Sequence, residues 1–161
     1  MSTTNIQPFA KELDFEKALT DLLLQNGWNE VIMNPTEEDL IKNWANIIFD
    51  NNRDITKLNN APLTNTEMQQ ILSKVNLCSS PYDMNKFING QEVSIKRDNH
   101  DDHNNYGKVV YLKIFDPKEI CAGQSRYQIV RQPRFKTALP LAGDRRGDIM
   151  LLINGMPVIH V

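Results

Sequence analysis

The chain has 161 residues and a mass of 18.5 kDa, a length that suits one domain with its own hydrophobic core. Its 40% hydrophobic and 24% charged residues are typical of a globular protein, and its apolar runs are too short to cross a membrane. No secretory signal opens the sequence. Cys78 and Cys121 are not in a Cys-x-x-Cys arrangement, so we expect reduced thiols and a cytoplasmic location.

Charge is distributed unevenly along the chain. The net charge of −2 argues against a general nucleic-acid binder. Residues 1–100 carry nine Lys and Arg against fourteen Asp and Glu, a net charge of −5, whereas residues 101–161 carry nine against six, a net charge of +3. The basic cluster between positions 126 and 146 suits contacts with a phosphate backbone, although a solvated basic face explains the charge equally well.

The first part of the chain is predicted to form a helix followed by a short strand. Apolar residues recur at roughly helical spacing from about Pro8 to Gln25, including Leu13 and Leu22. Asn26-Gly27 is a typical helix stop. The apolar residues 31–33 that follow favour a short strand.

Two more helices are expected in the first half. Asn34-Pro35, followed by a threonine and three acidic residues, predicts a helix that runs to about Asn51. A third helix is expected to start at Thr64 or Thr66, and Ser80-Pro81-Tyr82 is expected to break it.

The second half is rich in strands. Alternating or β-branched runs predict strands at residues 92–97, 108–115 and 127–131, with a hairpin at the end of the sequence. A helical half followed by a strand-rich half predicts an α+β fold, in which helices pack on one mixed central sheet.

The final hairpin places a carboxylate at its open end. Asn154-Gly155 between two apolar runs is the strongest short-range signal for a hairpin. A two-residue loop places Asp148 opposite Val161, whereas a three-residue loop closed by a bulge places it opposite the residue that would follow. Facing side chains lie roughly 5 Å apart, so two carboxylates there could share a divalent cation. An aspartate that merely caps the strand is the alternative, and it stays open.

The segment His100-Asp101-Asp102-His103 also places metal-binding side chain types close together. It lies in a polar, Asn-rich stretch at residues 98–107, where no apolar residues would support a metal site. We therefore expect a solvated loop here and assign no zinc.

A family resemblance rests on the final hairpin. Its sequence, Arg146-Gly147-Asp148-Ile149-x-Leu151-x-Ile153-Asn154-Gly155-x-Pro157, resembles the segment before Glu-x-Lys in the R (HsdR-type) subunit of type I restriction–modification enzymes. That subunit begins with a nuclease domain of the PD-(D/E)xK superfamily. Shorter similarities lie at Phe15-Glu16-x-x-Leu19, Val110-x-Leu112-x-Ile114-Phe115-Asp116 and Tyr127-x-Ile129-Val130-x-Gln132. The family often has proline where this chain has Gly147.

This resemblance implies a restriction-endonuclease-like core, with residues 1–161 forming a single N-terminal nuclease domain. The chain ends on an apolar strand, so we expect a fragment truncated just before Glu-x-Lys. In the full-length protein the resemblance implies Mg²⁺-dependent phosphodiester hydrolysis. Asp148 would be a catalytic residue and metal ligand, the missing Glu a second ligand, and the missing Lys would act on the attacking water.

The resemblance also assigns roles to residues around Asp148. Glu16 is a catalytic candidate that either approaches the metal or holds the site by hydrogen bonds, the alternative being an exposed helix acid. Contacts with DNA are expected from a set of polar and basic residues, namely Gln132, Arg134, Lys136, Arg145 and Arg146. Gln132 could contact either the DNA backbone or Asp148, and an edge-strand polar residue is the alternative. Arg145 and Arg146 could equally be solvated loop charges.

The implied partners are double-stranded DNA and the modification and specificity subunits of a restriction complex, with no membrane. ATP is expected to act only through motor domains outside this chain, because the sequence has no Gly-x-x-x-x-Gly-Lys-Ser/Thr loop. We expect the isolated chain to be inactive, because one carboxylate cannot hold the metal alone. The alternatives are another nuclease of the superfamily, Mrr-like or a repair enzyme, and a non-catalytic docking module.

Overall fold

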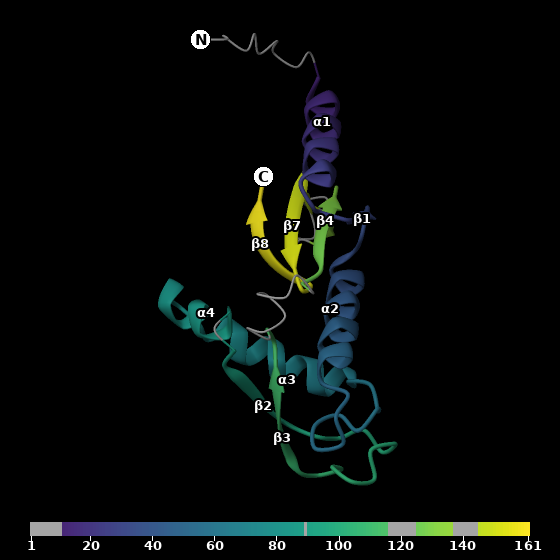
Figure 1. Ribbon diagram of the computed structural model, residues 1–161, viewed down its shortest axis with the longest axis vertical. Helices are drawn as coiled ribbons and strands as arrows, with labels where there is room; N and C mark the ends of the chain where they lie inside the picture. The colour runs from purple at the N-terminus through teal and green to yellow at the C-terminus, as the bar shows by residue number, and fades with distance from the viewer. Residues whose placement is uncertain (1–10, 89, 116–124, 137–144) are drawn as a thin grey trace.

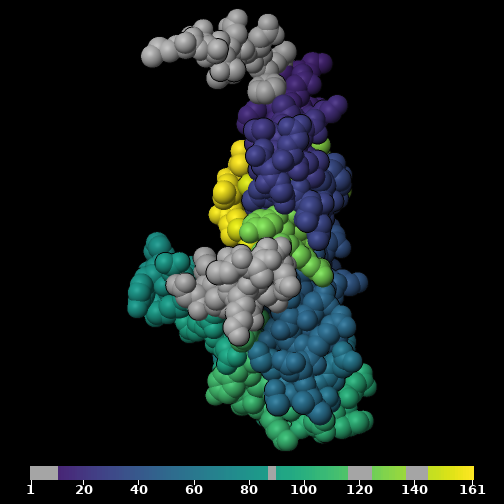
Figure 2. Space-filling view, viewed as in Figure 1, coloured from purple at the N-terminus to yellow at the C-terminus, as the bar shows by residue number. Residues whose placement is uncertain are grey.

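A computed structural model describes residues 11–88, 90–115, 125–136 and 145–161. In chain order the elements are α1 (Glu12–Gln25), β1 (Glu30–Met33), α2 (Glu37–Asn51), α3 (Asn65–Asn76), α4 (Pro81–Ile88), β2 (Glu92–Lys96), β3 (Val109–Lys113), β4 (Tyr127–Arg131), β5 (Arg134–Phe135), β6 (Arg145–Arg146), β7 (Ile149–Ile153) and β8 (Met156–His160). The described residues form an elongated body with α1 at one end and the β2–β3 pair at the other (Figures 1 and 2).

The central sheet is mixed and has the strand order β1-β4-β7-β8. β1 runs parallel to β4, whereas β4 with β7 and β7 with β8 are antiparallel. This confirms the predicted α+β class. The prediction of one sheet is wrong in part, because β2 pairs with β3 in a separate two-stranded sheet that packs against α3.

α1 covers one face of the central sheet. Its Leu19 and Leu23 pack against a small core of Ile129, Ile149 and Leu151. Other apolar side chains of the helix, Leu13 and Leu22, are 57% and 56% exposed, contrary to the inward positions that helical spacing suggested. Figure 1 shows that α1 reaches past the end of the sheet, so the beginning of the helix lies beyond the strands. Leu22 immediately precedes the packed Leu23 and therefore lies on another side of the helix.

α2 connects the sheet to the other end of the molecule. It begins where the sequence predicts, because Thr36 and Asp39 form a reciprocal capping box that satisfies free backbone N–H groups. Its Trp44 and Ile48 join α3, β2 and β3 in the larger hydrophobic core. Asn43 of the same helix exchanges hydrogen bonds with Gln128 of β4 at 3.0 and 3.1 Å. α2 thereby fixes the sheet relative to the β2–β3 half.

The segment predicted to break the third helix instead starts a fourth. α3 follows its N-cap Thr64, the first of the two predicted starts. Pro81 is then the first residue of α4, and the Ser80 hydroxyl accepts a hydrogen bond from the backbone N–H of Asp83 at 3.2 Å. A serine before a proline is also compatible with a helix start, because serine is a favoured N-cap and proline suits the first helical position.

The polar stretch between β2 and β3 is only partly solvated. Asp102 is fully buried and pairs with the equally buried Arg97 at 3.0 Å, so the expectation of a solvated loop is wrong for this residue. His103 is exposed, and His100 stacks on Tyr106 with ring centroids 4.5 Å apart. Among the helices that the structure describes, none is both long enough and apolar enough to span a bilayer.

Candidate functional site

The register of the final hairpin places Asp148 at the open end of the sheet. Asn154 and Gly155 adopt φ values of 50° and 80°, the left-handed pair that a two-residue hairpin turn requires, and Ile153 faces Met156. A register shift further along leaves Val158 as an extra residue, as in a β-bulge. Beyond the bulge, Ile149 pairs with Val161 through backbone hydrogen bonds of 2.8 and 3.5 Å.

This register combines features of both predicted alternatives. The loop has two residues, as in the first alternative. The bulge inside β8 then shifts the pairing by one residue, so that beyond it the partners are those that the three-residue loop predicts. Asp148 therefore lies opposite the position that follows Val161 in the direction of β8. The C-terminus and the start of β7 lie at the same end of the sheet, beside α1 (Figure 1).

The Asp148 side chain is exposed, and its backbone is held by β4. The Asp148 carbonyl accepts a hydrogen bond of 2.8 Å from the backbone N–H of Gln132, which follows β4 directly. Gln132 has a φ of +54°, a conformation that residues other than glycine seldom adopt. Within the described part of the chain, no hydrogen bond or ion pair engages the Asp148 carboxylate. The carboxylate is therefore open to a ligand from solvent.

Glu16 is buried beside this site, so the alternative of an exposed helix acid is wrong. The side chain is 4% exposed, and its Oε2 accepts hydrogen bonds from Arg131 Nη2 at 3.0 Å and from Gln132 Nε2 at 3.2 Å. The same glutamine therefore bonds to Glu16 through its side chain and to Asp148 through its backbone. Of the two predicted roles, these contacts favour holding the site by hydrogen bonds.

Sequence reasoning missed Arg131 as part of this site. The residue ends β4 and faces Ile149 across the sheet, on the side that α1 covers. Its guanidinium forms an ion pair with Glu16, and only 17% of its side chain is exposed. Because side chains two residues apart in a strand lie on the same face, the sequence predicts that Arg131 and Ile129 share a face. That Glu16 lies above this face follows only from the packing of α1.

The predicted DNA-binding residues gather next to Asp148. β5 and β6 form a short antiparallel pair in which Arg134 faces Arg146 and Phe135 faces Arg145. We define the basic ribbon as the basic side chains of this strand pair together with that of the residue after β5. It consists of Arg134, Lys136, Arg145 and Arg146. Two arginines directly opposite each other repel, so the arrangement favours an anion between or above them.

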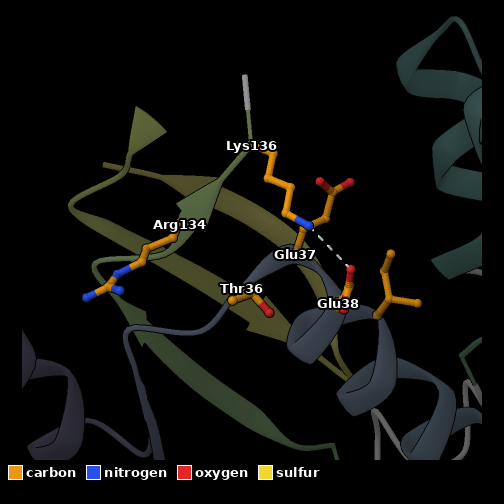
Figure 3. Close-up of a pocket in the computed structure, with 6 residues that line it drawn as sticks. Thr36, Glu37, Glu38, Arg134 and Lys136 are labelled. Carbon is orange, nitrogen blue, oxygen red and sulfur yellow. Dashed lines mark ion pairs between the residues drawn. The ribbon is translucent and has the colours of Figure 1, made fainter. Parts of the chain in front are cut away.

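The beginning of α2 anchors the basic ribbon. The Arg134 backbone N–H donates to the Pro35 carbonyl at 2.9 Å. A cavity of about 400 Å³ lies here, lined by Thr36, Glu37, Glu38, Ile41, Arg134 and Lys136. Figure 3 shows Lys136 directed at Glu38, with which it forms an ion pair of 3.6 Å, whereas Arg134 points away from both glutamates.

The three arginines of the ribbon carry charge that no acidic side chain offsets within the described residues. None of the acidic side chains that the structure describes forms an ion pair with Arg134, Arg145 or Arg146. All three arginines are exposed. The positive charge is therefore available to an external anion such as a phosphate.

The donor set around Asp148 fits a divalent cation with one protein carboxylate already in place. Among the described residues, no three His, Cys, Asp or Glu side chains lie close enough together to hold a metal ion. Asp148 offers an exposed carboxylate without protein partners, and carboxylate oxygens are what Mg²⁺ prefers.

Comparison with known proteins places this arrangement in a family. Residues 10–161 match the family model that describes the N terminus of the type I restriction enzyme R protein. The chain is 27% identical over 153 residues to the endonuclease subunit of type I restriction enzyme SsaAORF53P from Staphylococcus saprophyticus. It is 25% identical over 153 residues to the endonuclease subunit of type I restriction enzyme SauMSSORF170P from Staphylococcus aureus strain MSSA476.

Both alignments cover 95% of this chain, but the chain spans only 14% of the length of these relatives. The family model, in contrast, covers nearly all of the chain. The resemblance found in the final hairpin is thereby confirmed, and the chain belongs to the family of type I restriction enzyme R protein N termini.

Proposed function

We propose that this chain forms the nuclease part of the DNA-cleaving subunit of a type I restriction–modification complex. In this proposal the full-length protein hydrolyses phosphodiester bonds of double-stranded DNA with Mg²⁺. The observation that carries the proposal is the exposed Asp148 carboxylate, which follows the strand pair that carries three exposed arginines. None of these four side chains has an ion-pair partner among the described residues.

Each residue of the site has a role in the proposal. Asp148 holds the cation together with a carboxylate at the facing position after Val161, and the bound Mg²⁺ would activate water and offset charge on the phosphate. Gln132 keeps the Asp148 backbone in place through their 2.8 Å hydrogen bond. Glu16 positions Gln132 and Arg131 from the α1 side.

The basic ribbon would contact the DNA backbone rather than the bases. Arginine pairs with phosphate through two parallel hydrogen bonds, and such contacts fix the position of a protein on DNA without reading its sequence. Arg146 lies two residues before Asp148 in the chain and pairs with Arg134, so a phosphate bound there would bring the DNA strand to the carboxylate. The choice of DNA sequence is left to the specificity subunit.

The remaining parts of the proposal concern the whole protein. Its partners would be the modification and specificity subunits, and its ATP dependence would come from motor domains outside these residues. It would work in the cytoplasm. The isolated 161-residue chain would not cleave DNA, because Asp148 alone cannot hold the cation in a reactive geometry.

The test is cleavage of plasmid DNA by the full-length subunit in its complex, with Mg²⁺ and ATP. Asp148→Asn should lower cleavage on the order of 10³-fold, because a catalytic metal contributes several kcal/mol to the transition state. DNA binding should persist. Asp101→Asn, at an exposed loop position, is the matched control and should cleave normally. Normal cleavage by Asp148→Asn would contradict the proposal and favour a docking module.

A further inference from the structure

His160 lies against the backbone next to Asp148. A Cβ atom at Gly147 would lie 2.9 Å from the Nε2 of His160 and 3.1 Å from the Cγ of Pro133. The contact of 2.9 Å is shorter than real Cβ atoms show, so the imidazole occupies the space that a side chain at position 147 would need. Gly147 is buried, and its N–H donates to the Pro133 carbonyl at 3.0 Å. The glycine therefore makes room for the histidine.

Strand register brings His160 close to Asp148 along the hairpin. His160 of β8 pairs with Met150 of β7. Asp148 lies in a bend directly before β7, two residues before Met150 and next to the Gly147 backbone that the imidazole contacts. The two residues are diagonal neighbours, roughly 7 to 8 Å apart at the backbone, which an imidazole can bridge. His160 is also exposed, as Asp148 is.

A carboxylate and an imidazole together have a different metal preference from carboxylates alone. Mg²⁺ prefers oxygen ligands, whereas an imidazole nitrogen suits transition metal ions. We propose that His160 supplies a nitrogen ligand to the cation held by Asp148, and that this pair makes the site bind Mn²⁺ more tightly than Mg²⁺. The inference rests on the proposed function, because it concerns the same cation.

The experiment measures Mn²⁺ and Mg²⁺ binding to the 161-residue chain, which already contains both side chains. Mn²⁺ broadens the NMR signals of nearby imidazoles, and the chain has three histidines, so His100 and His103 serve as internal references. Electron paramagnetic resonance of free Mn²⁺ gives the dissociation constant of the Mn²⁺ complex. Displacement of Mn²⁺ by added Mg²⁺ gives the dissociation constant of the Mg²⁺ complex. Amide spectra of every variant verify that the fold is retained.

Three variants separate the contributions. His160→Gln removes the nitrogen ligand and should weaken Mn²⁺ binding about tenfold or more, the loss typical of a removed metal-site partner. Gly147→Ala keeps both ligands but displaces the imidazole, and it should weaken Mn²⁺ binding in the same way. Gly147 has no positive φ, so alanine suits its backbone. His103→Gln, at an exposed position, is the matched control and should bind both ions as the unaltered chain does.

The outcomes distinguish this inference from the proposed function. Unchanged Mn²⁺ binding by His160→Gln, broadening confined to His100 and His103, or no Mn²⁺ binding at all would each overturn the role of His160. Loss of binding in Asp148→Asn but not in His160→Gln would leave the proposed metal site standing without the histidine. Binding that survives both substitutions would contradict the metal role of Asp148 as well.

Discussion

At the scale of single residues, the ion pair of Glu16 and Arg131 fixes α1 to the end of β4, next to Asp148. Glu16 is buried in a helix whose other acids are exposed, and burial of a carboxylate is unfavourable unless it is paired and hydrogen-bonded. Arg131 supplies the charge and Gln132 a second hydrogen bond. The pair links α1 to the end of β4, directly beside the backbone that carries Asp148.

Removing both partners of this pair should cost less than the two single substitutions added together. Glu16→Ala leaves the mostly buried Arg131 without its partner and should lower the free energy of unfolding by about 3 kcal/mol. Arg131→Met should cost a similar amount, whereas the double variant should cost clearly less than the sum, because no lone charge remains. Urea denaturation measures all three. Asp21→Ala, an exposed acid on the same helix, is the control. Additive effects would show that the two side chains do not stabilise each other.

At the scale of elements, the turn of the final hairpin is fixed by both its backbone and its neighbours. Gly155 has a φ of +80°, and a Cβ there would lie 2.9 Å from Trp44 Cδ1 and 3.0 Å from Trp44 Cα. The close approach lets α2 pack directly on the turn. The register of β8, and with it the position facing Asp148, depends on this contact.

Gly155→Ala should therefore lower the free energy of unfolding by more than the backbone strain of an alanine at positive φ accounts for. We expect a loss of about 2 to 5 kcal/mol, the sum of conformational strain and overpacking. Gly27→Ala is a matched control, because its φ is +96° but nothing lies within 4 Å of the added Cβ. It should lose only about 1 to 2 kcal/mol. Thermal or urea unfolding compares the two. Equal losses would show that the contact with Trp44 relaxes without cost.

The charge of the basic ribbon should determine part of the salt dependence of the DNA affinity. If Arg134 and Arg146 each contact one phosphate, Arg134→Ala and Arg146→Ala should each reduce the salt slope of the DNA affinity by about 1. Fluorescence anisotropy with double-stranded DNA between about 50 and 200 mM salt measures this slope. Arg53→Ala is the control, because Arg53 is already paired with Asp50 at 2.5 Å. Unchanged slopes in both ribbon variants would exclude the ribbon from the DNA interface.

At the scale of the whole molecule, the sequence predicts elements well where the signal is local. The capping residues of α2, the β-branched Ile129 and Val130 of β4 and the Asn154-Gly155 turn each lie within a few residues of what they specify. Asp148 could be found for the same reason, since it belongs to the hairpin motif. The start of α4 could not, because serine before proline is also typical of a helix end.

Features that depend on distant contacts could not be predicted. The separation of β2 and β3 from the central sheet reflects their packing on α3. Arg131 joins the site only because α1, more than a hundred residues earlier in the chain, places Glu16 beside it. Asp102 looked like a loop residue because its partners Arg97 and Asn59 are recognisable only after folding.

The network around Arg97 connects the loops of the β2–β3 half to α3. Arg97 is 1% exposed and forms ion pairs with Glu67 and Asp102, both of which are fully buried. Burial opposes ionisation of Asp102, but hydrogen bonds from Arg97, Asn59 and Asn105 outweigh it and hold the pKa below its ordinary value of 3.8. The ionised aspartate is therefore part of what stabilises this half of the molecule.

The stability of the chain should accordingly fall in acid. Because folding lowers the pKa of Asp102, the folded state binds fewer protons than the unfolded state, and the stabilisation is present above about pH 4. It is lost as the pH falls through the lowered pKa of the folded state. Urea unfolding between about pH 6 and pH 2.5 should show this loss. Asp102→Asn should be less stable at neutral pH, and its stability should change less with pH below about pH 4.

Asp101→Asn, at the exposed neighbouring position, should follow the unaltered chain. If the Asp102→Asn curve instead runs parallel to that of the unaltered chain, other carboxylates account for the acid sensitivity, and the Arg97 network contributes no pH dependence through this residue.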